Sequence, residues 1–181
     1  MTSAEGNLSW EPAQRHTDLL APSVVTALAS APSARVAPID AALADTAAFC
    51  EAYDVAMDRS ANCVVVAGKR GGDLRYAAVL VLAIDRADIN GVVRRHLDVR
   101  KISFAPMDEA VALTGMEFGG ITPLGLPEGW PVLVDTAVVT AGEVVIGSGI
   151  RASKLLVPAA DLVALPGAEV LDLALTRQTA D

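Results

Sequence analysis

The chain has 181 residues, a formal net charge of −8, an apolar fraction of 52% and only 4% aromatic residues. This length fits one domain, with or without a tail, and the core must consist mostly of Val, Leu, Ile and Ala. The longest apolar run, Tyr76–Ile84, is about half as long as a membrane-spanning helix requires, and no basic segment followed by a hydrophobic one opens the chain. We therefore expect a cytoplasmic protein without a membrane partner.

Cysteine and histidine are scarce and widely separated. Cys50 and Cys63 lack the spacing of a zinc site, and His16 and His96 are far from any Cys or Asp pattern. Both cysteines have the character of small buried residues. The sequence therefore predicts neither a metal site nor a cofactor.

The basic residues are concentrated in the middle of the chain. Residues 69–101 contain 8 of the 14 Lys and Arg residues and 4 Asp residues, so their local charge is 8 − 4 = +4. A basic patch on an acidic body is compatible with binding the end of a tRNA. Solvated faces of helices and turns explain the same pattern equally well.

The pattern up to residue 113 predicts short helices and strands in a single domain. We place this domain at residues 18–176, between a flexible polar tail at 1–17 and a second tail at 177–181. Helices are predicted over 22–30, 45–53, 88–97 and 106–113. Strands are predicted at 35–39, 63–66, 76–84 and 101–104, with a hairpin turn at 68–73.

In the rest of the chain, strands are predicted at 132–135, 137–140, 144–147 and 169–173, and a helix at 158–165. The segment 144–147 is expected to pair back with 137–140 across a turn at 141–143. Short strands interleaved with short helices predict an α+β fold with a mixed, barrel-like β-sheet core.

The most distinctive stretch is Thr114–Pro127, which contains four glycines, two prolines and a single charged residue, Glu117. Glycine allows positive φ and a close approach of the backbone, whereas proline fixes φ and removes a donor. The run Gly119-Gly120-Ile121-Thr122-Pro123 could thus direct consecutive N–H groups at one carbonyl or phosphate oxygen. A tight turn between buried strands is the simpler interpretation.

This run resembles the glycine-x-x-x-proline loop of the YbaK/EbsC-type aminoacyl-tRNA editing domains, also called prolyl-tRNA-synthetase-associated domains. Its surroundings are similar too, since an apolar strand ending in Asp135 follows and Gly147–Arg151 is a glycine-basic turn. The resemblance extends over about residues 20–175. It implies a mixed β-barrel core decorated with helices.

The resemblance also implies a chemistry, the hydrolysis in trans of the ester of mischarged aminoacyl-tRNA at its acceptor end. Backbone N–H groups of Gly119–Thr122 would stabilise the developing oxyanion, and a vicinal ribose hydroxyl of the substrate would help to place an ordered water. A small pocket would sort amino acids by size. Asp135 would orient this water or the α-amino group, or would simply end its strand as a turn former.

The candidate substrate-binding residues lie on three segments of the sequence. They are Arg59, Ala61, Asn62 and Cys63 near the start of a strand, Phe118 beside the loop, and Gly149, Arg151 and Lys154 in and after the later turn. Arg151 and Lys154 would face the tRNA end or lie in a solvated turn. A thiol nucleophile at Cys63 is disfavoured because no His is near in sequence.

One departure from the family pattern concerns the start of the strand at 61–66. The family carries a lysine where this chain has Ala61 or Asn62, and a neutral side chain cannot replace an ammonium as a phosphate partner. Arg59 and Lys69 are near enough in sequence to be substitutes. The sequence therefore leaves two functions open: an editing deacylase, or a catalytically silent homologue that binds tRNA ends, aminoacylated small molecules or an aminoacyl-tRNA synthetase.

Overall fold

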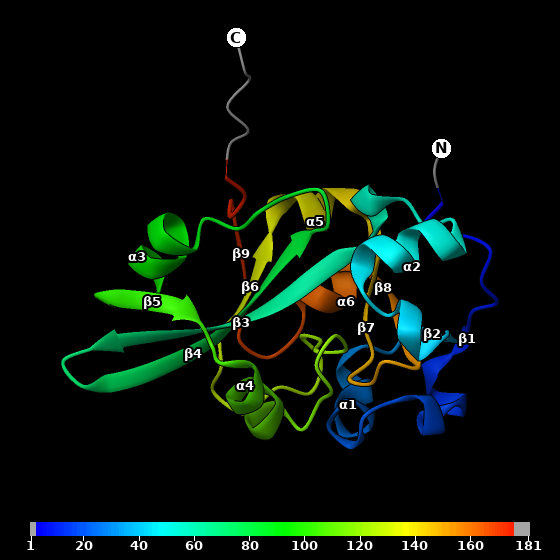
Figure 1. The fold of residues 1–181 in the computed structure, drawn as a ribbon, viewed down its shortest axis with the longest axis horizontal. Helices are drawn as coiled ribbons and strands as arrows, with labels where there is room; N and C mark the ends of the chain where they lie inside the picture. Colours follow the sequence, from blue (N-terminus) through cyan, green and yellow to red (C-terminus); the bar gives the residue numbers. More distant parts are fainter. Residues whose placement is uncertain (1–2, 176–181) are drawn as a thin grey trace, which may run out of the picture.

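The computed structural model describes residues 3–175 and arranges them as two β-sheets with short helices around them (Figure 1). One sheet has the strand order β1-β2-β8-β7 and the other β5-β3-β4-β6-β9. The strands are β1 Glu11–Pro12, β2 Arg35–Pro38, β3 Ala61–Arg70, β4 Asp73–Leu82, β5 Lys101–Phe104, β6 Val132–Asp135, β7 Glu143–Gly147, β8 Ser153–Pro158 and β9 Ala168–Leu171.

The helices are short and connect or cover the sheets. They are α1 Pro22–Ala27, α2 Thr46–Tyr53, α3 Arg94–His96, α4 Met107–Thr114, α5 Thr136–Ala141 and α6 Ala159–Val163, with a π-helical turn at Ile89–Val93 and 3-10 turns at Ala13–Arg15, Thr17–Leu19, Leu28–Ser30, Ala41–Leu43 and Met57–Arg59. None of the helices within residues 3–175 has the length and apolar character that a membrane crossing requires.

The fold class is α+β with mixed sheets, as predicted, since β6 runs parallel to β4 and β9 while the other pairs are antiparallel. The two sheets are linked by an isolated bridge between Ser60 and Val145, but over residues 3–175 they do not close into a barrel. The main core lies between the sheets and includes Leu80, Val134 and Leu155. A second core lies between the other face of the five-stranded sheet and the segment that leads into α3.

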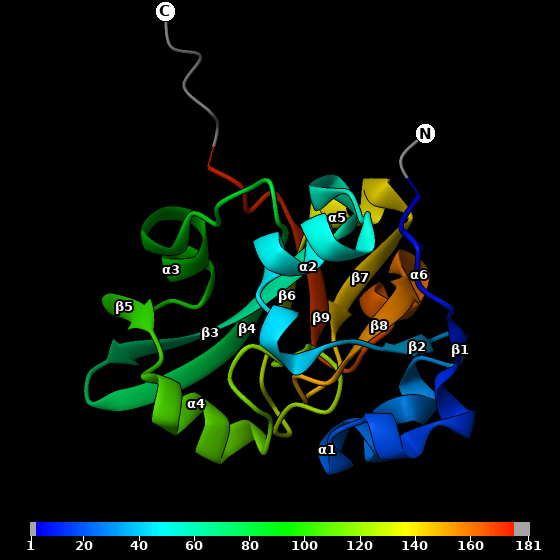
Figure 2. The same cartoon turned by 45° about the vertical axis from the view of Figure 1, so that its right-hand side comes forward.

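The β3–β4 hairpin is the longest element and projects from the body in two views (Figures 1 and 2). Its strands pair in register from Ala61 with Leu82 to Arg70 with Asp73. The turn consists of Gly71 and Gly72, which both have positive φ, as a two-residue hairpin turn demands. The hairpin was predicted, but its strands extend further at the turn end because the polar residues there remain paired outside the core.

The predicted strand at 137–140 is wrong, because this segment is helix α5. Val138 and Val139 favour strands locally, but the carboxylate of Asp135 accepts a hydrogen bond from the N–H of Ala137 at 2.9 Å and caps a helix. Consequently β7 cannot pair with this segment. It pairs instead with β8, which the sequence analysis did not identify as a strand.

The N-terminal segment, expected to be a flexible tail, packs against the domain over residues 3–17. Strand β1 pairs with β2, and Ala13 is fully buried. The indole N–H of Trp10 donates to the carbonyl oxygen of Glu5 at 2.8 Å. The polar sequence gave no periodic signal because only isolated apolar side chains of this segment enter the core. The second predicted tail, residues 177–181, lies outside the described residues.

Candidate active site

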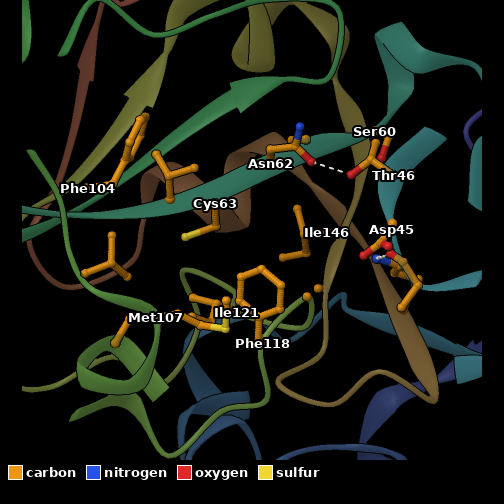
Figure 3. A pocket seen from close by; sticks show the side chains of 18 of the residues that line it. Asp45, Thr46, Ser60, Asn62, Cys63, Phe104, Met107, Phe118, Ile121 and Ile146 are labelled. Atoms are coloured by element: carbon orange, nitrogen blue, oxygen red, sulfur yellow. Dashed lines mark hydrogen bonds between the residues drawn. The ribbon is translucent and has the colours of Figure 1, made fainter. Parts of the chain in front are cut away.

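A cavity of about 420 Å³ opens where the two sheets and the glycine-rich loop meet (Figure 3). Its polar side chains come from the start of α2 and from β3 and β8. Its apolar wall comes from four segments and includes Cys63, Val65, Phe104, Met107, Ile121 and Ile146. A mostly apolar wall with a few polar groups is typical of a site for a small ligand moiety.

The cavity exists because one edge of β3 is left open. Strand β5 pairs with β3 only from Val66 to Lys69, so the described residues provide no strand neighbour on that side of Ala61–Val65. The start of α2, the loop at 118–121 and the end of β7 surround this open edge instead.

The glycine-rich loop is folded onto the turn between β7 and β8. Gly120 donates its N–H to the carbonyl oxygen of Glu117 at 2.9 Å, and its own carbonyl accepts the N–H of Gly149 at 2.7 Å. The N–H of Thr122 points at the sulfur of Met116 at 3.4 Å. These contacts fix the loop and occupy two of its four predicted donors.

The N–H groups of Gly119 and Ile121 differ, because neither donates to an acceptor within residues 3–175. Both residues line the cavity. Thr122 and Pro123 do not line it, and the Thr122 side chain is completely buried with its hydroxyl unpaired. Of its four predicted backbone donors, the loop therefore leaves two unengaged, and both belong to residues that line the cavity.

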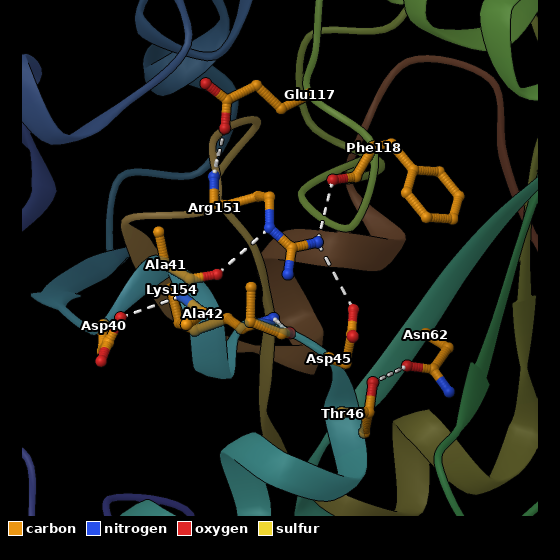
Figure 4. Close-up of polar contacts among 11 residues, drawn as sticks. Asp40, Ala41, Ala42, Asp45, Thr46, Asn62, Glu117, Phe118, Arg151 and Lys154 are labelled. Carbon is orange, nitrogen blue, oxygen red and sulfur yellow. Dashed lines mark hydrogen bonds and ion pairs between the residues drawn. The ribbon is translucent and has the colours of Figure 1, made fainter.

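Arg151 holds the loop to the start of α2 (Figure 4). Its backbone N–H donates to a carboxylate oxygen of Glu117 at 2.7 Å, and its Nε donates to the carbonyl oxygen of Ala41 at 3.1 Å. Its Nη1 reaches the carbonyl oxygen of Phe118 at 3.3 Å and Oδ1 of Asp45 at 3.4 Å. Arg151 therefore ties the loop to the start of α2 at the edge of the site, with its backbone N–H, Nε and Nη1 engaged.

The position beside the Arg151 guanidinium group requires a glycine, which is Gly119. Its φ is +83°, and a Cβ at this position would collide with Nη1 of Arg151. A side chain at residue 119 would thus strain the backbone and displace the guanidinium group. The exposed ring of Phe118 extends from the same loop into the mouth of the cavity (Figure 3).

Lys154 on β8 brings a cation to the cavity. The residue is only 8% exposed, and its Nζ donates to the carbonyl oxygen of Ala44 at 2.8 Å and lies 5.2 Å from the ring centroid of Phe49. Burial lowers the pKa of Lys154 to about 8, although nearby Cys50 and Asp45 oppose this shift. An ammonium with few protein partners in a dry site is suited to hold an anionic or carbonyl oxygen of a ligand.

The candidates on β3 also reach the cavity. Ala61, Asn62 and Cys63 all line it, and the Asn62 side chain oxygen accepts a hydrogen bond from the Thr46 hydroxyl at 2.6 Å. Burial raises the pKa of Cys63 to about 12, so this thiol stays protonated at neutral pH and is not a nucleophile.

Besides Gly120, Thr122, Pro123 and Arg151, three further predicted site residues lie outside the cavity lining. Asp135 is 1% exposed, and besides capping α5 it accepts the N–H groups of Leu173 at 2.7 Å and Ala174 at 3.1 Å. Arg59 donates to the carbonyl oxygen of Ala141 at the end of α5. Gly149 has a φ of +86° and packs against α1.

Other residues enter the site that the sequence analysis did not select. Asp45 was predicted only as a helix cap, but its side chain makes no capping hydrogen bond and faces Arg151 at the cavity rim. Thr46, Phe104 and Met107 are brought in from α2, β5 and α4. No local pattern marks them, because each is an ordinary helix or strand residue in sequence. Within residues 3–175, no group of His, Cys, Asp and Glu could hold a metal ion.

The family model of the aminoacyl-tRNA editing domain matches residues 40–165. The chain belongs to the aminoacyl-tRNA editing domain family. The matched segment of this editing domain includes every residue that lines the cavity.

Solved structures share the fold of this editing domain. A protein proposed to be a trans-editing enzyme for prolyl-tRNA synthetase matches with a TM-score of 0.73 and 24% identity, over 92% of this chain and 99% of that chain. The hypothetical protein APE2540 matches with a TM-score of 0.72 and 23% identity, over 82% and 95%. A protein from Marinobacter aquaeolei VT8, proposed to act in signal transduction, matches with a TM-score of 0.56 and 21% identity, over 85% of this chain and 31% of that chain.

Proposed function

We propose that this editing domain hydrolyses the ester of mischarged aminoacyl-tRNA in trans, in the cytoplasm, and releases the wrong amino acid from the acceptor end. The observation that carries the proposal is the pair of unengaged N–H groups of Gly119 and Ile121 at the wall of a cavity that admits a small group. Family membership supports the same substrate class.

The mechanism relies on positioning and electrostatics. When water attacks the ester carbonyl, negative charge develops on the carbonyl oxygen, and the two backbone N–H groups stabilise it in a partly dry site. Among the described lining residues there is no His, the Cys63 thiol is protonated, and the Asp45 carboxylate faces Arg151. An activated ester needs little further help, so an ordered water placed by the substrate's own ribose hydroxyl completes the reaction.

Lys154 takes the place of the family lysine that is absent at Ala61 and Asn62. Its ammonium donates to one backbone carbonyl and has further N–H groups available for the terminal phosphate of the substrate. Arg59 cannot serve, because it is bound to Ala141 outside the cavity. The cation would thus reach the site from β8 instead of β3.

A second candidate is a silent homologue that binds tRNA ends, aminoacylated small molecules or a synthetase without hydrolysis. The absence of a cation at the start of β3 favours the silent homologue. Ala61 there is 5% exposed, and the side-chain oxygen of Asn62 accepts a hydrogen bond from Thr46. The editing enzyme and the silent homologue are therefore distinguished by whether the bound ester is hydrolysed.

Hydrolysis of an aminoacyl-tRNA panel tests the proposal. The panel consists of prolyl-tRNA mischarged with Ala, Cys, Ser or Thr, together with correctly charged controls. We expect selective release of one amino acid, because the cavity wall sorts side chains by size. Lys154→Met should lower this release, whereas Arg95→Met on α3, which removes the same charge from the other face of the five-stranded sheet, should not. No release from any substrate by the folded protein would favour the silent homologue.

A further inference from the structure

Two lysines face each other across neighbouring strands near the tip of the β3–β4 hairpin. Lys69 on β3 is the register partner of Lys101 on β5, and both are exposed. Within residues 3–175 neither makes an ion pair or a side-chain hydrogen bond. Like charges directly opposite in a sheet destabilise it. The fold therefore gains nothing from this pair of charges.

The arginines of the same hairpin behave differently. Arg70 forms an ion pair with Asp98, and Arg75 donates to the carbonyl oxygen of Leu97 at 2.9 Å. These contacts attach the hairpin to the segment after α3. Lys69 on the hairpin and Lys101 on β5 are thus the cations that stay available here for an external partner.

The lysine pair lies on the cavity side of the sheet. Side chains alternate along a strand, so Lys69 shares a face with Val65 and Cys63, which line the cavity. Four residues of strand place Lys69 about 13 Å beyond Val65. Phe104, at the end of β5, borders the cavity, but it pairs with Val66 and its ring therefore projects from the other face of the sheet than the two lysines.

We propose that Lys69 and Lys101 form a phosphate clamp for the single-stranded 3′ end of the RNA whose terminal nucleotide enters the cavity. The inference rests on the proposed function and adds the path of the RNA strand along the hairpin. A phosphate between the two ammonium groups replaces their repulsion by two charge-assisted contacts.

Salt-dependent binding of an uncharged RNA hairpin with a single-stranded CCA end tests the clamp. Loss of two phosphate contacts to a single strand reduces the magnitude of the slope of log K against log salt by about 1.4, which corresponds to about 25-fold weaker binding at 0.1 M salt. We expect this for Lys69→Gln/Lys101→Gln and not for the charge-matched Arg94→Gln/Arg95→Gln on the other face. The lysine variant should be at least as stable as the wild type, because it loses a like-charge pair.

Three results would overturn the clamp: no binding of the hairpin by the wild type, equal losses in the two double variants, or no loss in either. Hydrolysis distinguishes this failure from failure of the proposed function. In an active protein, the lysine variant should raise KM for aminoacyl-tRNA and leave hydrolysis of an aminoacyl-adenosine, which lacks the phosphates, unchanged. A wild type that hydrolyses neither substrate but binds RNA through the lysines would refute the proposed function and retain the clamp.

Discussion

Replacing Lys154 by Met should change how the stability of the domain depends on pH. The pKa of Lys154 is lowered by burial from its ordinary value of 10.5 to about 8. Between these two values the unfolded chain binds more protons than the folded protein, so the free energy of unfolding rises with pH. A difference of about 2.5 pKa units corresponds to about 3 kcal/mol. The folded protein bears this whole cost below pH 8, and the cost has disappeared above pH 10.5.

Urea unfolding of the wild type and of Lys154→Met, followed by circular dichroism from pH 7 to 10.5, measures the effect. Burial raises the pKa of Cys50 and Cys63, and these thiols lower the stability of both proteins above about pH 9. The difference between the two proteins largely removes that contribution. We expect the wild type to gain about 3 kcal/mol relative to the variant across the window. The exposed Lys101→Met serves as control, and a constant difference between wild type and Lys154→Met would refute the burial of a titrating ammonium.

Two further substitutions separate structural roles from chemical ones. Asp135→Ala leaves one buried and two partly buried N–H groups without their acceptor and should lower the free energy of unfolding by about 3 kcal/mol, while turnover per folded molecule stays unchanged. A variant that is as stable as the wild type but inactive would instead show that Asp135 takes part in the hydrolysis. Gly120→Ala puts a Cβ 2.8 Å from the backbone of Ile150 and should cost about 1–3 kcal/mol, measured as a lower Tm. An unchanged Tm would contradict the packing of this loop on the turn between β7 and β8.

The sequence by itself determined the features that depend on local physics. Gly115 ends α4 with a φ of +67°, and the double glycine at 71–72 makes the hairpin turn. Strand β5 has the predicted bounds, Lys101–Phe104. The glycine-rich loop was recognisable because positive φ and close backbone approach admit few other residues. These features were predictable since each is decided within a few residues of chain.

Only the tertiary structure decided how these elements are used. Helix α5 forms from residues with strand propensity because the Asp135 carboxylate caps it. The same carboxylate is held in place by a hydrogen bond from the N–H of Leu173, which follows β9. Asp45 and Lys154 both line the cavity although 109 positions separate them in the sequence. The residues around neither of them form a pattern that predicts this proximity. The open edge of β3, and hence the cavity itself, depends on where β5 stops pairing. Such features follow from the balance of packing and desolvation over the whole domain, which a single sequence does not reveal position by position.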